Sequence, residues 1–186
     1  MATLRYFAYG SNMLRERLVA RVSMARTVAV GVVRDYRLDF AKVSVDHSGK
    51  ADMVSSPGGE VWGVLYEFDS DQKAALDRHE GVHYKARGVV VAMPAGDETA
   101  CAYMAEPHRR DPSKVPYDWY LALVVAGARQ GGLPAAYIQV LEATTFDVDG
   151  IEDRASRREA LAALADAGMT SVLDEVRRHA VLTKGE

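Results

Sequence analysis

The stretch YFAYGSNM, residues 6–13, predicts a strand that turns directly into a helix. Residues 4–9 alternate with the period of two that is typical of a strand, and Gly10 ends the alternation. The following MLRERLVAR, residues 13–21, places apolar side chains on one face of a helix, whose start we expect Ser11 or Asn12 to cap. The N-terminus therefore predicts a strand, a tight turn and a helix.

Strand-like patterns continue from this point to residue 105, and turn signals separate them. The predicted strands are TVAVGVVRD (27–35), YRLDFA (36–41), EVWGVLYEF (60–68), RGVVVAM (87–93) and ETACAYMA (98–105). The predicted turns include SSPGGE (55–60) and PAGDE (94–98). Between two of these strands, DSDQKAALDRHEG (69–81) predicts a short helix that ends at Gly81.

From Tyr117 onward the pattern becomes helical, and we expect helices over 117–132, 134–143, 152–168 and 169–181. Strands that cluster early and helices that cluster late differ from a regular βαβα alternation. They predict an α+β fold with a mixed, mostly antiparallel sheet, curved or barrel-like, and flanking helices. Because no linker interrupts the chain, we expect residues 1–186 to form a single domain.

Composition argues against several classes of partner. Lys and Arg number 23 against 26 Asp and Glu, so a net charge of −3 favours neither nucleic acid nor a membrane surface. The only cysteine, Cys101, rules out an intrachain disulfide and agrees with a reducing compartment. No apolar run reaches the roughly 18 residues of a spanning helix, and the start of the chain lacks the features of a signal peptide. We expect a cytoplasmic protein.

The string HEGVH, residues 79–83, matches the H-E-x-x-H signature in which two histidines bind zinc and the glutamate acts as a general base. That signature requires a continuous helix, but Gly81 lies in its middle and a strand-like run follows closely. We therefore expect no metal, and we place His79 and His83 at an exposed helix end. A zinc hydrolase that uses His79, Glu80 and His83 remains the competing hypothesis.

Two local features suggest chemistry. A carboxylate at a helix C-terminus is disfavoured by the helix dipole, so the pKa of Glu80 should rise if the residue is buried. The alternative interpretation is an exposed glutamate beside a terminating glycine.

The turn at Gly10 and Ser11 would leave N–H groups free to bind a carboxylate or a developing oxyanion, and a side chain at Gly10 would block a ligand. The other reading is an ordinary connection between a strand and a helix.

Three motifs in order resemble the γ-glutamylcyclotransferase family: YFAYGSNM (6–13), SSPGGEVWGVLYEF (55–68) and ALDRHEGV (75–82). DYRLDFA (35–41) precedes the middle motif and YLALVVAGARQGGLPAAY (120–137) follows the last one, so the resemblance covers about residues 4–142. It implies an enzyme without metal or cofactor in which the α-amine of a γ-glutamyl substrate attacks its own γ-carbonyl. The products are 5-oxoproline and a free amine or amino acid.

The resemblance also implies the site. Glu80 matches the catalytic glutamate of the family, which accepts a proton from the attacking amine and returns it to the leaving amine. The implied substrate-binding residues are Tyr6, Phe7, Ala8, Tyr9, Gly10, Ser11, Asn12, Tyr103 and Tyr120.

Some features depart from the family pattern. Histidines on both sides of Glu80 are unusual for it, and His79 could tune Glu80 by its charge. The helical extension, about residues 152–181, is longer than expected; it covers the core or forms a subunit contact, as in a possible homodimer. The preferred leaving group stays open between an amino acid, an amine and a larger acyl conjugate. A third hypothesis is a non-catalytic module that binds a γ-glutamyl ligand.

Overall fold

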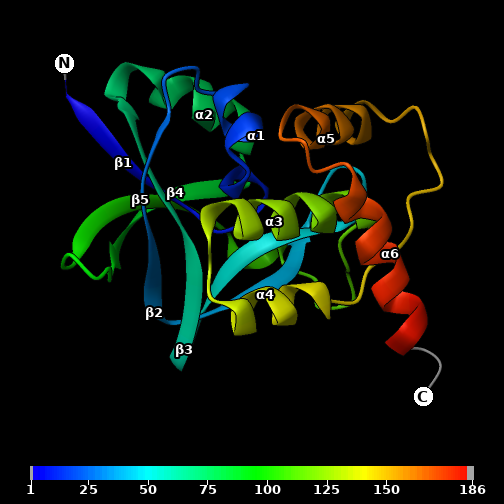
Figure 1. The fold of residues 1–186 in the computed structure, drawn as a ribbon. Coiled ribbons are helices and arrows are strands. Elements are labelled where there is room, and N and C mark those ends of the chain that lie inside the picture. The colour runs from blue at the N-terminus through cyan, green and yellow to red at the C-terminus, as the bar shows by residue number, and fades with distance from the viewer. Residues whose placement is uncertain (1, 184–186) are drawn as a thin grey trace.

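The computed structural model describes residues 2–183, which form one five-stranded sheet with helices packed against it (Figure 1). The strands are β1 (Thr3–Ala8), β2 (Arg26–Val43), β3 (Gly49–Asp69), β4 (Tyr84–Val91) and β5 (Glu98–Ala105). The α-helices are α1 (Arg15–Val19), α2 (Lys73–Glu80), α3 (Asp118–Gly131), α4 (Ala135–Glu142), α5 (Ala155–Asp166) and α6 (Ser171–Thr183). Short 3₁₀ turns are η1 (Ser11–Met13), η2 (Ser70–Gln72) and η3 (Pro107–Arg109).

The sheet is mixed and mostly antiparallel, with strand order β2-β3-β1-β5-β4. Only β1 and β5 run parallel; the other neighbours are antiparallel. One isolated bridge joins the two edges, where Val32 and Ala92 exchange backbone hydrogen bonds of 3.0 and 2.9 Å. A sheet whose edges meet must be strongly curved, yet one bridge leaves it short of a closed barrel. The predicted α+β class and curved sheet are confirmed.

β2 and β3 differ from the prediction because they are much longer than expected. The predicted strands 27–35 and 36–41 form one continuous strand, and the predicted turn 55–60 lies inside β3. Asp35 adopts a left-handed φ of 64°, and its carboxylate accepts a 2.9 Å bond from the amide of Gly58 across the pair. The register shifts here, so the glycine-rich segment is an irregular part of a ladder. The chain reverses instead at residues 44–48.

The helix predicted over 13–21 is shorter and is not capped as expected. Leu14 is extended, with φ −71° and ψ 115°, and separates η1 from the five-residue α1. Neither Ser11 nor Asn12 caps a helix with its side chain. Both side chains have other partners: Ser11 accepts a bond from Arg17, and Asn12 bonds to Tyr6 and Glu80.

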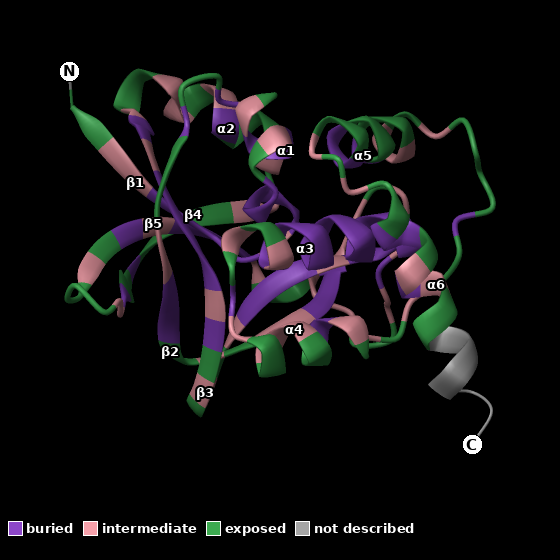
Figure 2. Cartoon of the chain, viewed as in Figure 1, coloured by how far each residue is buried: buried purple, intermediate pink, exposed green. Residues whose placement is uncertain are grey.

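α3 is the central helix of the molecule and is buried without interruption from Asp118 to Ala128 (Figure 2). The four predicted late helices are present, and α4, α5 and α6 all pack on α3. The α6 residue Arg177 donates a 2.7 Å bond to the carboxylate of Asp118, which has no exposed surface. The helical extension therefore covers a helix that would otherwise expose an apolar face.

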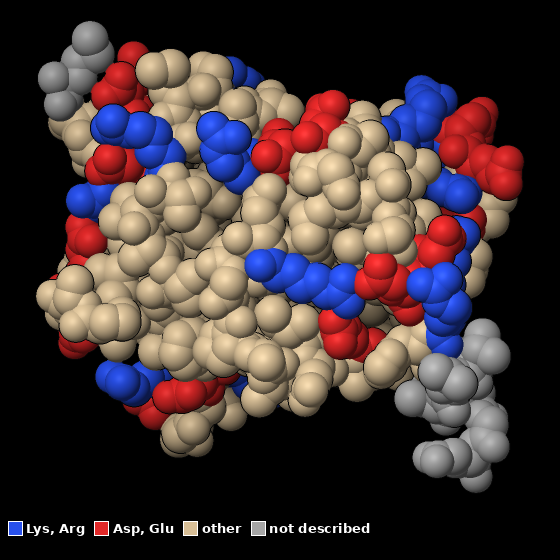
Figure 3. All heavy atoms as spheres, in the orientation of Figure 1, with Lys and Arg blue, Asp and Glu red and all other residues tan. Residues whose placement is uncertain are grey.

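The surface carries charges of both signs. On the face shown in Figure 3, acidic and basic side chains lie beside one another mainly around the edge, and much of the middle carries neither. Within residues 2–183, no helix combines the length and the apolar character that crossing a bilayer requires.

Candidate active site

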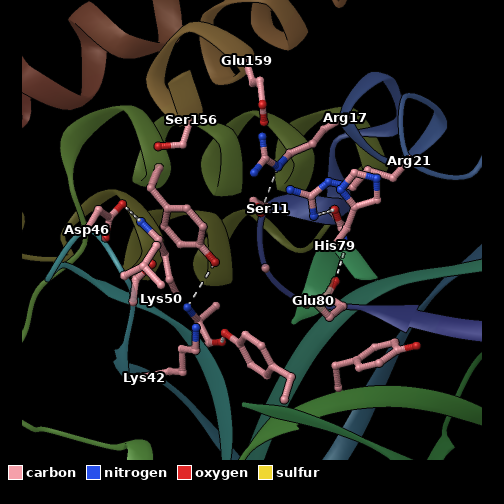
Figure 4. A pocket seen from close by; sticks show the side chains of 18 of the residues that line it. Ser11, Arg17, Arg21, Lys42, Asp46, Lys50, His79, Glu80, Ser156 and Glu159 are labelled. Carbon is pink, nitrogen blue, oxygen red and sulfur yellow. Dashed lines mark hydrogen bonds and ion pairs between the residues drawn. The ribbon is translucent and has the colours of Figure 1, made fainter. Parts of the chain in front are cut away.

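A cavity of about 510 Å³ opens where the end of β1 meets the C-terminus of α2 (Figure 4). Its walls also include the turn between β2 and β3, the start of α3 and the start of α5. Most of the predicted site residues line it: Tyr6, Tyr9, Gly10, Ser11, Asn12, Glu80, Tyr103 and Tyr120. Phe7 and Ala8 do not line it, because both lie in the hydrophobic core, where the Phe7 ring faces Gly63 of β3.

Asn12 connects the two segments that the sequence identified separately. Its side-chain nitrogen donates to the Glu80 carboxylate at 2.7 Å and to the Tyr6 hydroxyl at 3.0 Å. Its side-chain oxygen accepts a 3.0 Å bond from the guanidinium of Arg21. All three polar contacts fix the amide, so Asn12 orients the carboxyl group of Glu80 toward the turn after β1.

The surroundings of Glu80 change its acidity. Burial raises the pKa of Glu80 above its ordinary value, and the positive charges of Arg21, Arg17 and Lys42 and the bond from Asn12 oppose the rise. The residue is half-buried because it keeps some surface inside the cavity. A carboxyl group with a raised pKa exchanges protons closer to neutral pH, as a general base or acid requires.

Gly10 is required by contacts within the protein. A Cβ at this position would lie 2.9 Å from the Cβ of Ala51 and 3.3 Å from the Tyr120 hydroxyl. That hydroxyl accepts a 3.1 Å bond from the amide of Ala51, and the Tyr84 hydroxyl donates a 2.6 Å bond to the Ala51 carbonyl. The backbone at the end of β1 therefore packs directly against β3. From the sequence we expected a ligand in the space that a side chain at Gly10 would fill. In the structure, Ala51 and Tyr120 occupy that space.

Tyr6, Tyr9 and Tyr103 form a connected part of the cavity wall. The rings of Tyr6 and Tyr103 meet edge to face with 5.9 Å between centroids. The Tyr103 hydroxyl donates to Asp77 of α2, and the Tyr9 hydroxyl donates to the Tyr103 carbonyl. Burial raises the pKa of Tyr6, Tyr9 and Tyr103, so these phenols stay protonated around Glu80.

Sequence reasoning missed the basic side chains of the cavity. Arg17, Arg21, Lys42 and Lys50 all line it. Arg17 is 8% exposed, and its Nε donates to the Ser11 hydroxyl at 3.2 Å. The spacing of Arg17 and Arg21, four residues apart next to the YGSN turn, could have indicated a shared face. Nothing local distinguishes Lys42 or Lys50, because each gains its place only through the pairing of β2 with β3.

The helical extension contributes directly to the site. Ala155, Ser156 and Glu159 of α5, together with Arg154 just before it, line the cavity. Figure 4 shows Ser156 and Glu159 across the cavity from Glu80. The sequence predicted a cover for the core or a subunit contact here, and it gave no signal for a part in the cavity wall.

The zinc motif does not have the geometry that it requires. α2 ends at Glu80, and Gly81 follows with a left-handed φ of 76°, so His79 and His83 share no helix face. His79 lines the cavity although it is exposed, while the ring of His83 contacts the guanidinium of Arg109. Among the described residues, no group of three or more potential ligands is placed to hold a metal ion.

Comparison with known proteins agrees with this arrangement. The model of the AIG2-like family matches residues 60–141. The γ-glutamylcyclotransferase of Homo sapiens is 37% identical over 147 residues, which cover 74% of this chain and 77% of the human protein. The chain belongs to the γ-glutamylcyclotransferase family. The γ-glutamylcyclotransferase of Mus musculus is 35% identical over 150 residues, which cover 76% of this chain and 78% of the mouse protein.

A solved structure supports membership of the γ-glutamylcyclotransferase family. A protein described as a γ-glutamyl cyclotransferase superposes with a TM-score of 0.78 at 29% identity, covering 87% of this chain and 99% of the other. The resemblance inferred from the three sequence motifs is therefore confirmed.

Proposed function

We propose that this chain is a γ-glutamylcyclotransferase, which converts a γ-glutamyl amino acid or amine into 5-oxoproline and releases the free amino acid or amine. One observation carries the proposal beyond family membership. The carboxyl group of Glu80 and the turn at Gly10–Asn12 line the same cavity and are joined by the 2.7 Å bond from Asn12. This shared lining supports a site in which a base and the main-chain N–H groups of the turn would act on one substrate molecule.

The reaction needs little from the protein beyond position and proton transfer. The substrate holds both nucleophile and electrophile, so a cavity that folds it into a ring-closing conformer supplies a high effective concentration. The carboxylate of Glu80 accepts a proton from the α-amine as the amine forms a bond to the γ-carbonyl carbon. The same carboxyl then gives that proton to the departing nitrogen as the original C–N bond breaks. Glu80 returns to its starting state, and no water is consumed.

The glutamyl half of the substrate belongs beside the turn after β1. Main-chain amides at Gly10 and Ser11 bind the substrate α-carboxylate or the tetrahedral oxyanion, a contribution of about 3 to 4 kcal/mol for one such donor. The guanidinium of Arg17, which is bonded to Ser11, favours a negative group at this place. Tyr103 and Tyr120 line the part of the cavity in which the five-membered ring would form.

Four further predictions from the sequence accompany the proposal. The reaction as written uses no metal or cofactor. A cytoplasmic location, a homodimer and the lack of a nucleic-acid partner remain predictions.

Replacing the proposed base tests the function. Glu80→Gln keeps the size of the side chain and its bond to Asn12, so the fold should persist while turnover falls by about 10²- to 10⁴-fold. Release of 5-oxoproline is measured over a panel of γ-glutamyl dipeptides and γ-glutamyl amines. Glu60→Gln, on the exposed part of β3, is the matched control and should behave as the parent protein.

Two outcomes would refute parts of this proposal. Full activity of Glu80→Gln removes Glu80 from the mechanism. No 5-oxoproline from any substrate refutes the enzyme itself; thermal stabilisation by the same compounds would then identify a binding module. Stoichiometric zinc together with inactivation by a chelator would favour the hydrolase hypothesis instead.

A further inference from the structure

The basic side chains of the cavity differ in whether a carboxylate already neutralises them. Lys50 forms a 3.0 Å ion pair with Asp46, and Arg154 forms a 2.6 Å ion pair with Asp149. Among the described residues, Arg17, Arg21 and Lys42 have no carboxylate oxygen within 4.0 Å. Three unneutralised cations in one cavity indicate a ligand that carries more than one negative group.

These three cations occupy two separate places. Figure 4 shows Arg17 and Arg21 on the side of the YGSN turn and Lys42 on the opposite side. Arg17 and Arg21 are connected to the catalytic network, because they bond to Ser11 and Asn12. Lys42 belongs to β2 and shares no hydrogen bond with that network.

Lys42 is held in place but lacks an anionic partner. The residue is only 9% exposed, and its ammonium group lies 4.8 Å from the centre of the Tyr84 ring. Burial lowers its pKa, and the negative charge of Glu80, the largest opposing influence, raises it. A buried ammonium group that faces a cavity without a counterion is placed to receive an anion from the substrate.

The connectivity of a γ-glutamyl compound decides which anion this is. The α-amine and the α-carboxylate share one carbon, so an amine at Glu80 places its carboxylate beside Ser11 and Arg17. The leaving group extends from the γ-carbonyl, away from that end. We propose that Lys42 binds the carboxylate of a leaving amino acid and makes the enzyme select γ-glutamyl amino acids over γ-glutamyl amines, an inference that rests on the proposed function.

Two substrates that differ in this carboxylate test the role of Lys42. γ-Glutamylethylamide is γ-glutamylalanine without the carboxylate of its leaving group. The parent protein should have the larger kcat/KM for γ-glutamylalanine. Lys42→Met keeps the length of the side chain but removes its charge, so the ratio of the two kcat/KM values should fall about tenfold or more, chiefly through KM for γ-glutamylalanine. Lys42→Arg should keep most of the ratio.

Lys85→Met, on the exposed face of β4, is the control for the loss of a lysine and should keep the parent ratio. A ratio that is unchanged in Lys42→Met overturns the inference, because Lys42 would then act on the glutamyl half or on Glu80. Equal turnover of both substrates by the parent protein overturns it without any variant. Failure of the parent protein to release 5-oxoproline from these two substrates and from every other member of the panel refutes the proposed function itself.

Discussion

At the scale of single residues, Asn12 is the hydrogen-bond donor that holds the carboxyl group of Glu80. Its amide donates to Glu80 and accepts from Arg21, so one side chain connects the carboxylate to a guanidinium and holds it in place. This contact spans 68 positions of the sequence. The catalytic group and its closest polar neighbour therefore come from segments that only the folded sheet brings together.

Placing a charge at position 12 should change the pH at which the enzyme works. Asn12→Asp would place a second carboxyl group beside Glu80 and would remove the bond that lowers the Glu80 pKa. Both changes raise that pKa, because like charges disfavour ionisation. Since the base must be deprotonated, the acid limb of kcat/KM should move to higher pH. Measuring kcat/KM against pH checks this.

Asn12→Ala is the companion variant, because it removes the bond without adding a charge. Its acid limb should move in the same direction by a smaller amount. An acid limb that stays in place in both variants would show that another group titrates in the profile.

Part of the site was predictable at this scale, and part was not. Glu80 and the YGSN turn stand out as motifs, and Tyr103 and Tyr120 follow from the family pattern. Lys42 carries no such signal, because a lysine within a strand is normally solvated and only the curvature of the sheet directs it into the cavity. Asn12 was predicted as a helix cap or a substrate-binding residue, and neither role indicates its bond to Glu80, which depends on the folded sheet.

At the scale of elements, two ion pairs join α3 and α6, Arg177–Asp118 and Arg129–Glu175, and the carboxylate of Asp118 has no exposed surface. Arg177→Met would leave the carboxylate of Asp118 buried without its guanidinium partner. We expect the free energy of unfolding to fall by about 2 to 3 kcal/mol, less than the ~3 to 5 of a fully buried pair because Arg177 is partly exposed. Denaturant titration measures the change.

Arg178→Met changes the neighbouring arginine, which is exposed on the same helix, and should shift stability by no more than about 0.5 kcal/mol. An equal loss in both variants would mean that the helix itself, and not the pair with Asp118, had been weakened.

Elements also show where pattern reading fails. The predicted strand segments and late helices could be inferred from the spacing of apolar residues, because an element with one buried face needs apolar residues at its own period. The lengths of β2 and β3 could not, since turn-forming residues at 55–60 are tolerated by a register shift against Asp35. Local composition cannot distinguish such an irregular ladder from a true reversal.

At the scale of the whole molecule, the site is a product of nearly the entire chain. Its lining extends from Tyr6 in β1 to Glu159 in α5. We therefore expect residues 1–186 to unfold as one cooperative unit, with the helical extension included.

Two probes of unfolding can check this cooperativity. In Trp62→Phe, fluorescence reports Trp119 alone, which is buried in α3 and donates a 2.9 Å bond to Asp149. Far-UV circular dichroism reports the whole chain, and both denaturation curves should share one midpoint. An earlier midpoint for fluorescence would show that the helical extension separates first. Comparing the dichroism of Trp62→Phe with that of the parent protein controls for the substitution.

The dependence of α3 on α5 and α6 has a consequence for biosynthesis. The ribosome makes β1 to α3 first, and at that stage the outer face of α3 has nothing to cover it. That face is buried, and the cavity wall is completed, only after α5 and α6 have been made. We expect a nascent chain that stalls before α5 to be inactive and prone to aggregate, because its apolar face on α3 is still exposed.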